Sequence, residues 1–251
     1  TIMSLLPKGI LFDLDDTIIA YGVAAEPIWK SICNTYAERS GMGDPSRFFE
    51  AIDDVRKWYW SDSKRHRIGR MDLDNTRTKL IHLALDGLGI DDRLLGREIS
   101  NAFACQLHKE IRFFPEAEET LVYLKSRGTA LALMTNGESH KQREKIDRFH
   151  LNRFFSTILI EGELGFGKPD KNVYITALNR LGLSPKDVWS IGDNLEWDVF
   201  GPQKLGIFGI WCNSRGQDLP DSPGATPNRV VGSIAELMEP QQQAHLPCFS
   251  E

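Results

Sequence analysis

Hydrophobic and polar positions follow two different patterns along this chain of 251 residues. Residues 9–14 form a short, almost continuously apolar run, which is typical of a strand buried on both faces of a parallel sheet. From residue 26 to residue 110, apolar residues instead recur at helical spacing, in stripes separated by glycine-containing segments. We therefore expect a bundle of about four helices, inserted after the first strand.

Strands and helices alternate in the second half of the chain. Strands are predicted over residues 129–134, 155–161, 188–191, 207–211 and 229–231. Helices are predicted over residues 116–127, 138–149, 171–182, 195–205 and 233–238. This alternation favours an α/β fold, in which helices cover both faces of a Rossmann-like parallel sheet.

The same patterns predict the domain organisation. We expect residues 1–20 and 113–240 to form the α/β core, which is therefore discontinuous in the sequence. The helical segment, residues 21–112, is expected to be a separate domain. Residues 241–251 are expected to be a loose tail, since they follow the last predicted helix and include a run of glutamines from residue 241 to residue 243.

Polar side chains stand where four of the predicted strands end. Because the carboxyl ends of parallel strands share one edge of a sheet, these side chains are expected to converge on one crevice. Two of them, Asp13 and Asp15, point to the same side because side chains alternate along a strand. The full set is Asp13, Asp15, Thr135, Asn136, Lys168, Asp193 and Asp198.

This set of side chains has the chemistry that phosphoryl transfer through an aspartyl-phosphate requires. Asp13 and Asp15 would repel each other at close range, and a bound divalent cation or a retained proton relieves that repulsion. One carboxylate can then act as a nucleophile and the other as an acid or base. Carboxylate oxygens suit Mg²⁺, while a lysine, a hydroxyl and backbone amides suit the oxygens of a phosphoryl group.

Each motif taken alone also has a structural explanation. Lys168 would fit an ordinary surface lysine before a helix, and residues 135–137 would fit a simple turn. Asp198 would fit the cap of the following helix, and Asp16 and Asp170 would fit local turns or caps. The six histidines do not cluster, and none is assigned a role.

Composition narrows the classes of function and partner. The net charge of −5 provides no electrostatic basis for nucleic-acid binding, and no apolar run approaches the length of a membrane span. The N-terminal residues lack the pattern of a signal peptide. The four cysteines are scattered, which favours free thiols over a disulfide framework or a zinc site. We expect a cytoplasmic monomer or homodimer that acts on a small molecule, with neither nucleic acid nor membrane as a partner.

The polar strand endings resemble, in order, the four motifs of the haloacid dehalogenase (HAD) superfamily of hydrolases. They read FDLDDT at residues 12–17, MTNG at 134–137, GKPD at 167–170 and GDNLEWD at 192–198. The helical segment after the first strand is similar to the C1-type cap domain of that superfamily. The resemblance covers essentially the whole chain and implies a HAD-like core with an inserted cap.

The resemblance also implies a role for each site residue. Asp13 would be the nucleophile and Asp15 the general acid and base. Mg²⁺ would be held by Asp13, Asp193 and the backbone carbonyl of Asp15. The phosphoryl group would be bound by Thr135, Asn136 and Lys168, and the residues next to the metal ligands would be Asn194 and Asp198.

The reaction class follows from one position of the resemblance. The dehalogenase branch of the superfamily lacks a carboxylate at the position of Asp15, so its presence here implies hydrolysis of a phosphate ester. A phosphomutase on a sugar phosphate needs the same core and stays open, as does a phosphate-responsive binding protein. Among phosphatases, the Thr-Asn-Gly motif at residues 135–137, followed by Gln142, Arg143 and Lys145, resembles the branch that contains N-acylneuraminate-9-phosphatase and pyrimidine 5′-nucleotidases.

Substrate selection is expected in the helical domain. Residues 58–70 combine aromatic side chains with five basic ones, which would fit a lid loop over an anionic or ring-bearing substrate. The favoured alternative is that Tyr59 and a tryptophan complete the core of the helical domain while most of the basic residues lie in solvent. Arg67, Arg70 and Tyr21 are kept as candidates for substrate contact.

Overall fold

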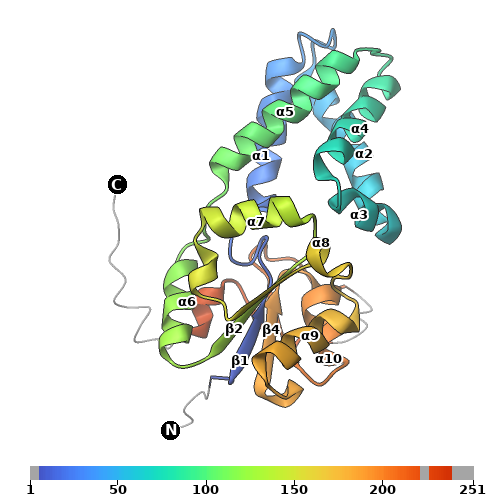
Figure 1. Ribbon diagram of the computed structural model, residues 1–251. Helices are drawn as coiled ribbons and strands as arrows, with labels where there is room; N and C mark the ends of the chain where they lie inside the picture. Colours follow the sequence, from blue (N-terminus) through green and yellow to red (C-terminus); the bar gives the residue numbers. More distant parts are fainter. Residues whose placement is uncertain (1–5, 221–225, 239–251) are drawn as a thin grey trace, which may run out of the picture. The chain divides into compact units, whose positions relative to one another are not determined.

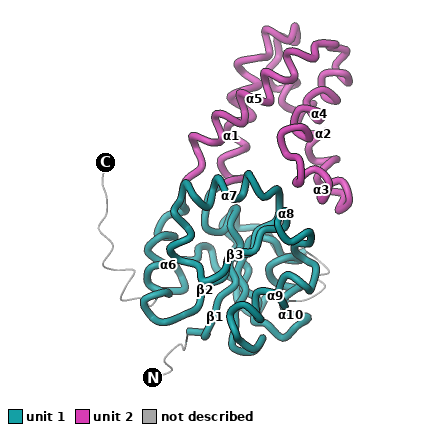
Figure 2. The backbone as a smooth tube through the Cα atoms, viewed as in Figure 1, with its two compact units in different colours: residues 1–20, 113–251 teal, residues 21–112 magenta. Residues whose placement is uncertain are grey.

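The computed structural model describes residues 6–220 and 226–238, and it divides the chain into two compact units. Unit 1 comprises residues 1–20 and 113–251, and unit 2 comprises residues 21–112 (Figure 2). The tail predicted over residues 241–251 lies outside the described residues.

Unit 1 contains a six-stranded sheet whose paired strands are all parallel, which confirms the predicted α/β class. Its spatial order is β3-β2-β1-β4-β5-β6. The central strand β1 pairs with β2 on one side and with β4 on the other, so the direction in which the chain builds the sheet reverses beside β1. Open parallel sheets bind their ligands at the carboxyl ends of the strands beside such a reversal. The strands are β1 (Gly9–Phe12), β2 (Ala130–Thr135), β3 (Thr157–Ile160), β4 (Val188–Gly192), β5 (Phe208–Cys212) and β6 (Arg229–Val231).

Helices cover both faces of this sheet. Figure 1 shows α6 (Ala117–Ser126) on one side and α9 (Lys171–Leu181) with α10 (Gly201–Gln203) on the other. The remaining helices of unit 1 are α7 (Ser139–Arg148), α8 (Glu161–Leu164) and the 3-10 helices η1 (Leu151–Arg153), η2 (Pro185–Asp187) and η4 (Ile234–Leu237). The helix predicted over residues 233–238 is therefore a single 3-10 segment.

The helix predicted over residues 195–205 is present, but not as one regular α-helix. Residues Leu195–Phe200 form a π-helix, labelled η3, and the short α10 follows it. Pro202 has no backbone N–H and so cannot continue a regular α-helical ladder through this segment. The side chain of Asn194 accepts a hydrogen bond from Trp197 N at 3.1 Å and caps the start of η3.

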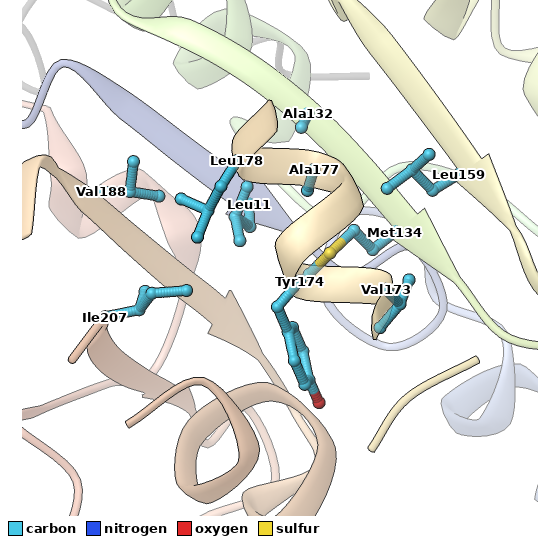
Figure 3. Packing of buried hydrophobic residues seen from close by; sticks show 10 residues of the cluster. All are labelled: Leu11, Ala132, Met134, Leu159, Val173, Tyr174, Ala177, Leu178, Val188 and Ile207. Atoms are coloured by element: carbon cyan, nitrogen blue, oxygen red, sulfur yellow. The ribbon is translucent and has the colours of Figure 1, made fainter. Parts of the chain in front are cut away.

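The packing of α9 on the sheet forms a central part of the core of unit 1 (Figure 3). One face of α9 contacts β1, β2 and β3 through buried apolar side chains, and full burial of a leucine or methionine among them stabilises the fold by about 1.5–3 kcal/mol. The hydroxyl of Tyr174 donates a hydrogen bond to Trp197 O at 2.5 Å and so joins α9 to η3. The contacting residues are Val173, Tyr174, Ala177 and Leu178 of α9 and Leu11, Ala132, Met134 and Leu159 of the strands.

Unit 2 is helical, as predicted, but its described residues form five helices rather than about four. They are α1 (Gly22–Tyr36), α2 (Pro45–Ser61), α3 (Ser63–Arg70), α4 (Leu73–Gly87) and α5 (Arg93–Glu110). The additional helix arises at Asp62, whose side chain accepts a hydrogen bond from Arg65 N at 2.8 Å and caps α3. Residues 58–61 and 63–70 are therefore helical rather than a loop, and contact of this stretch with substrate stays a prediction.

The aromatic residues at the end of α2 pack locally within unit 2. The rings of Tyr59 and Trp60 are half-buried and meet edge to face, with centroids 5.1 Å apart. The guanidinium of Arg65 lies over the ring of Trp58 at 4.2 Å. Both observations favour the structural explanation of the aromatic residues, although the partly buried Arg65 packs on a ring rather than lying in solvent.

Two further expectations concern the cysteines and the membrane. Cys33, Cys105 and Cys212 are free thiols, and Cys248 lies outside the described residues. Among the helices of the described part of the chain, none has both the length and the apolar character that a bilayer span requires.

Candidate active site

Asp13 stands directly after the central strand, where the chain leaves the sheet. Its backbone N–H donates to Ile191 O at 3.0 Å, which continues the pairing of β1 with β4 by one residue. The residue is 8% exposed, and its carboxylate accepts from the Thr17 hydroxyl at 3.1 Å on Oδ2 and from Lys168 Nζ at 2.7 Å on Oδ1. Because donors from two segments hold the two oxygens, the orientation of this carboxylate is well defined.

Lys168 is 1% exposed, which excludes the alternative of a surface lysine. Its Nζ also donates to Asp198 Oδ1 at 2.6 Å. The loop that carries it is held by Asn136, whose side-chain amide donates to Lys168 O at 2.7 Å and whose Oδ1 accepts from Lys168 N at 2.8 Å. Asn136, expected to bind the phosphoryl group, thus uses its side chain on the backbone of Lys168.

Three carboxylates gather around Lys168. Ligand oxygens of Asp13, Asp193 and Asp198 all lie within 4.8 Å of one another. Burial raises the pKa of Asp13 to about 7, opposed by Lys168 and assisted by the charge of Asp198. Burial and the charges of Asp13 and Asp198 raise the pKa of Asp193 to about 8. The cluster therefore holds more negative charge than one lysine compensates.

The lysine responds to the same charges in the opposite sense. Burial alone would lower the pKa of Lys168, but the charges of Asp13 and Asp198 outweigh it and raise the pKa above its usual value. Lys168 is therefore a permanent cation in this site. Its ammonium group has three N–H donors, and two of them are used by Asp13 and Asp198.

The donor set of this cluster fits a Mg²⁺ ion. Mg²⁺ takes oxygen ligands and is usually bound through one or two carboxylates while keeping several waters. Asp198 has both oxygens engaged, since Lys168 Nζ contacts Oδ1 and Asn194 N donates to Oδ2 at 3.1 Å. Both oxygens of Asp13 also accept hydrogen bonds, so these contacts do not rank the three carboxylates, and direct ligation by Asp13 and Asp193 stays a prediction. Asp198 is not merely the cap of the following helix, because Asn194 fills that position.

The Asp15 carboxylate is held from helix α7. Lys145 Nζ donates to its two oxygens at 2.8 and 2.6 Å, and Gln142 Nε2 donates to Oδ2 at 3.1 Å. The same amide group of Gln142 also donates to the hydroxyl of Thr135, the last residue of β2. No site role was predicted for Gln142 or Lys145. Their separation by three residues, which places both on one face of a helix that begins soon after Thr135, is the signal that could have found them.

The remaining predicted residues lie in local structure or in unit 2. Asp170 accepts from Asn172 N at 2.9 Å and caps α9, as its structural explanation predicted. Asp16 has a left-handed backbone (φ 63°) and pairs with Arg215 at 2.5 Å. Three candidates, Tyr21, Arg67 and Arg70, belong to unit 2, and their contact with substrate stays a prediction.

A family model described as haloacid dehalogenase-like hydrolase matches residues 7–206. The chain belongs to this family of HAD-like hydrolases. The membership confirms the resemblance of the four motifs, and it agrees with the parallel sheet and with the placement of the motif residues at the carboxyl ends of its strands.

Several HAD-like hydrolases are similar to this chain. The phosphoserine phosphatase of Thermus thermophilus is 39% identical over 141 residues, which are 56% of this chain and 55% of that protein, so the match spans about half of each. The glyceraldehyde 3-phosphate phosphatase of Methanothermobacter thermautotrophicus is 35% identical over 82% of this chain and 86% of its own length. Haloacid dehalogenases also occur among the matches.

The fold is shared with solved structures of HAD-like hydrolases. The structure of the HAD-hydrolase YfnB from Bacillus subtilis, bound to magnesium, is similar with a TM-score of 0.70 and 22% identity. The similarity covers 93% of this chain and 97% of that chain, and at this identity it bears on the fold alone.

Proposed function

We propose that this HAD-like hydrolase is a magnesium-dependent phosphatase that hydrolyses a small phosphorylated metabolite through an aspartyl-phosphate. The observation that carries the proposal is the buried carboxylate of Asp13, held by Lys168 and Thr17 beside Asp193 and Asp198. A second carboxyl, Asp15, follows two residues later. Two relatives of this chain are named as phosphatases, which supports the same reaction class. One of them matches about half of the chain, and the other matches most of it.

In the first half of the reaction, an oxygen of Asp13 attacks the phosphorus atom. The bond between phosphorus and the ester oxygen breaks, and Asp15 gives a proton to that leaving oxygen. The third N–H of Lys168 is left to hold a phosphoryl oxygen. The Thr135 hydroxyl accepts from Gln142, so its own proton is available to a second phosphoryl oxygen.

In the second half, water attacks the phosphorus of the aspartyl-phosphate. Asp15 takes a proton from that water, the bond between phosphorus and Asp13 breaks, and inorganic phosphate leaves. When bound at Asp13 and Asp193, Mg²⁺ supplies charge neutralisation for the phosphoryl group and for the crowded carboxylates.

The acid at position 15 separates this proposal from the alternatives. Departure of a halide needs no proton donor, whereas an alkoxide leaving group does, so Asp15 favours ester hydrolysis over dehalogenation. A phosphomutase would use the same residues, yet it would release little phosphate and would require a bisphosphate. A phosphate-responsive binding protein would have no need for a complete pair of nucleophile and acid.

The test is release of inorganic phosphate from p-nitrophenyl phosphate and a panel of phosphorylated metabolites, with Mg²⁺ and with a chelator. We expect release that depends on magnesium, that is abolished in Asp13→Asn and that falls by about 10²–10⁴-fold in Asp15→Asn. Asp147→Asn, the same chemical change at an exposed position of α7, should leave activity unchanged. If the folded wild-type protein with Mg²⁺ releases no phosphate from any compound, the proposal is wrong.

A further inference from the structure

Helix α7 holds the carboxylate of Asp15 through two side chains. Lys145 contacts both oxygens at 2.8 and 2.6 Å, and Gln142 adds a third hydrogen bond at 3.1 Å. Both donors are shielded, since the Lys145 side chain is 11% exposed and Gln142 is 3% exposed. The carboxylate thus has donors on both oxygens before any substrate arrives.

A neighbouring ion pair on the same helix is more exposed to solvent and serves as a comparison. Arg143 pairs with Glu163 through two contacts of 2.7 Å, but its side chain is 39% exposed and that of Glu163 is 33% exposed. Solvent screens such a pair, and its contribution to stability is small. The pair of Lys145 with Asp15 lies in a less exposed setting, where each charge constrains the other more strongly.

Asp15 needs such constraint because of where it stands in the chain. It follows β1 by three positions, outside any named strand, and its backbone makes only an isolated bridge to Ile19. A general acid or base must lie within hydrogen-bond reach of the reacting oxygen. The three contacts on two oxygens select one orientation of the Asp15 side chain.

Building on the proposed phosphatase function, we propose that Lys145 and Gln142 are positioning residues that hold Asp15 in the orientation required for both of its proton transfers. The side-chain amide of Gln142 donates to Asp15 and also to the hydroxyl of Thr135. It therefore fixes the position of the proposed acid/base relative to the hydroxyl that we assign to phosphoryl binding. Neither residue exchanges a proton in this proposal. Asp15 still gives its proton to the leaving oxygen and later takes one from water.

The two proton transfers differ in which substrates need them, and this difference makes the proposal testable. An alkyl phosphate has a poor leaving group that must be protonated as its bond breaks, whereas p-nitrophenolate leaves readily without a proton. Hydrolysis of the aspartyl-phosphate requires activation of water whichever substrate formed it. A misplaced Asp15 should therefore slow phosphorylation by alkyl phosphates, and it should slow hydrolysis of the intermediate for every substrate.

The central variant is Lys145→Met, which keeps the length of the side chain and removes the charge. On the preferred alkyl phosphate we expect kcat to fall about 10–100-fold with KM nearly unchanged. This loss is smaller than the factor of about 10²–10⁴ that general acid–base catalysis contributes, because Asp15 itself is retained. On p-nitrophenyl phosphate we expect a burst of about one p-nitrophenolate per enzyme followed by slow turnover. Lys145→Arg should restore part of kcat.

Two further variants separate positioning from general damage to the helix. Gln142→Leu should show the same burst together with a raised KM, because it also removes the contact with Thr135. Arg143→Met removes an ion pair from the same helix without touching Asp15, and it should behave as wild type on both substrates. Thermal unfolding of each variant establishes that the protein is folded.

The outcomes distinguish failure of this inference from failure of the phosphatase proposal. If the wild-type protein and Arg143→Met release no phosphate, the phosphatase proposal fails and this inference fails with it. If they are active but folded Lys145→Met matches them, or loses activity equally on both substrates with no burst, the positioning role is wrong while the phosphatase function stands. Should Lys145→Met fail to fold, the same criteria apply to Gln142→Leu and Lys145→Arg.

Discussion

At the scale of single residues, Lys168 compensates part of the negative charge of the site. It is the cation bonded to two buried carboxylates, Asp13 and Asp198, and its own burial is nearly complete. Removal of one partner from a buried ion pair leaves uncompensated charge, which is more costly than the loss of the attraction itself. The lysine is therefore expected to contribute to folding in addition to its proposed role in binding a phosphoryl group.

We predict that Lys168→Met lowers the free energy of unfolding by about 3–5 kcal/mol in the absence of divalent cations. The measurement is urea unfolding followed by circular dichroism, in the presence of a chelator. The double variant with Asp198→Asn should recover part of the loss, because it removes one of the two stranded charges. Lys204→Met, which breaks an exposed pair with Glu196, should change stability by less than about 1 kcal/mol. Equal effects of the two lysine variants would contradict this reasoning.

At the scale of elements, the end of β4 and the start of η3 approach each other at Gly192. A Cβ atom at this glycine would lie 2.2 Å from Cγ of Asp198, and it would also collide with Asp198 Oδ2 at 2.3 Å. Glycine is therefore required here by close approach. The carboxylate of Asp198 reaches Lys168 because the strand before it carries no side chain at this point.

We predict that Gly192→Ala displaces Asp198, destabilises the protein by about 1–3 kcal/mol and lowers kcat. The matched control is Gly87→Ala at the end of α4, where an added Cβ meets nothing within 4 Å. That control should be neutral or slightly stabilising, since alanine is the better helix former. Thermal unfolding and phosphate release on both variants make the comparison. If Gly192→Ala retains full stability and activity, the close approach does not constrain the site.

Two elements also show where local pattern fails. The apolar spacing of residues 195–205 indicates a helix correctly, but periodicity does not distinguish a π-helix from an α-helix. Residues 58–70 contain helix-compatible residues interrupted by Asp62, and its side chain begins a new helix rather than a loop. The cap at Asp62 is a contact with Arg65, three residues later, so this helix start could have been predicted from the sequence. The π-helix over residues 195–200 could not be predicted from apolar spacing.

At the scale of the whole molecule, the acid cluster links stability to pH. Asp13 and Asp193 have pKa values of about 7 and about 8 in the folded protein, against an ordinary value of 3.8. Between pH 4 and pH 8 the folded state therefore binds more protons than the unfolded state. By linkage, the free energy of unfolding without a metal ion falls as the pH rises through this window.

We predict that in a chelator the thermal unfolding midpoint falls from pH 5 to pH 8 more steeply than it does in Asp13→Asn. Mg²⁺ should raise the midpoint at pH 8 and have little effect at pH 5, because protons compete with the metal ion for the same oxygens. Calorimetry at four pH values in chelator and in Mg²⁺ provides the data. A midpoint in chelator that rises with pH relative to Asp13→Asn would contradict the raised pKa values.

The sequence by itself determined the fold class, the existence of a helical insertion and the chain positions of the candidate site residues. It could do so because buried strands are locally apolar and because each strand ends in a polar motif that is contiguous in the chain. The nucleophile candidate Asp13 and the separate motif residues Lys168 and Asp193 all follow from such local signals.

Only the tertiary structure decided which side chains meet. Lys168 contacts Asp13 across 155 residues of chain, and Lys145 contacts Asp15 across 130. Asn136 turned out to hold the backbone of Lys168, and Gln142 to join Asp15 with Thr135. These contacts depend on distances and orientations that arise when strands and helices distant in the sequence pack together. The sequence predicted that Asp13 and Lys168 would share one edge of the sheet, but not which atoms would meet.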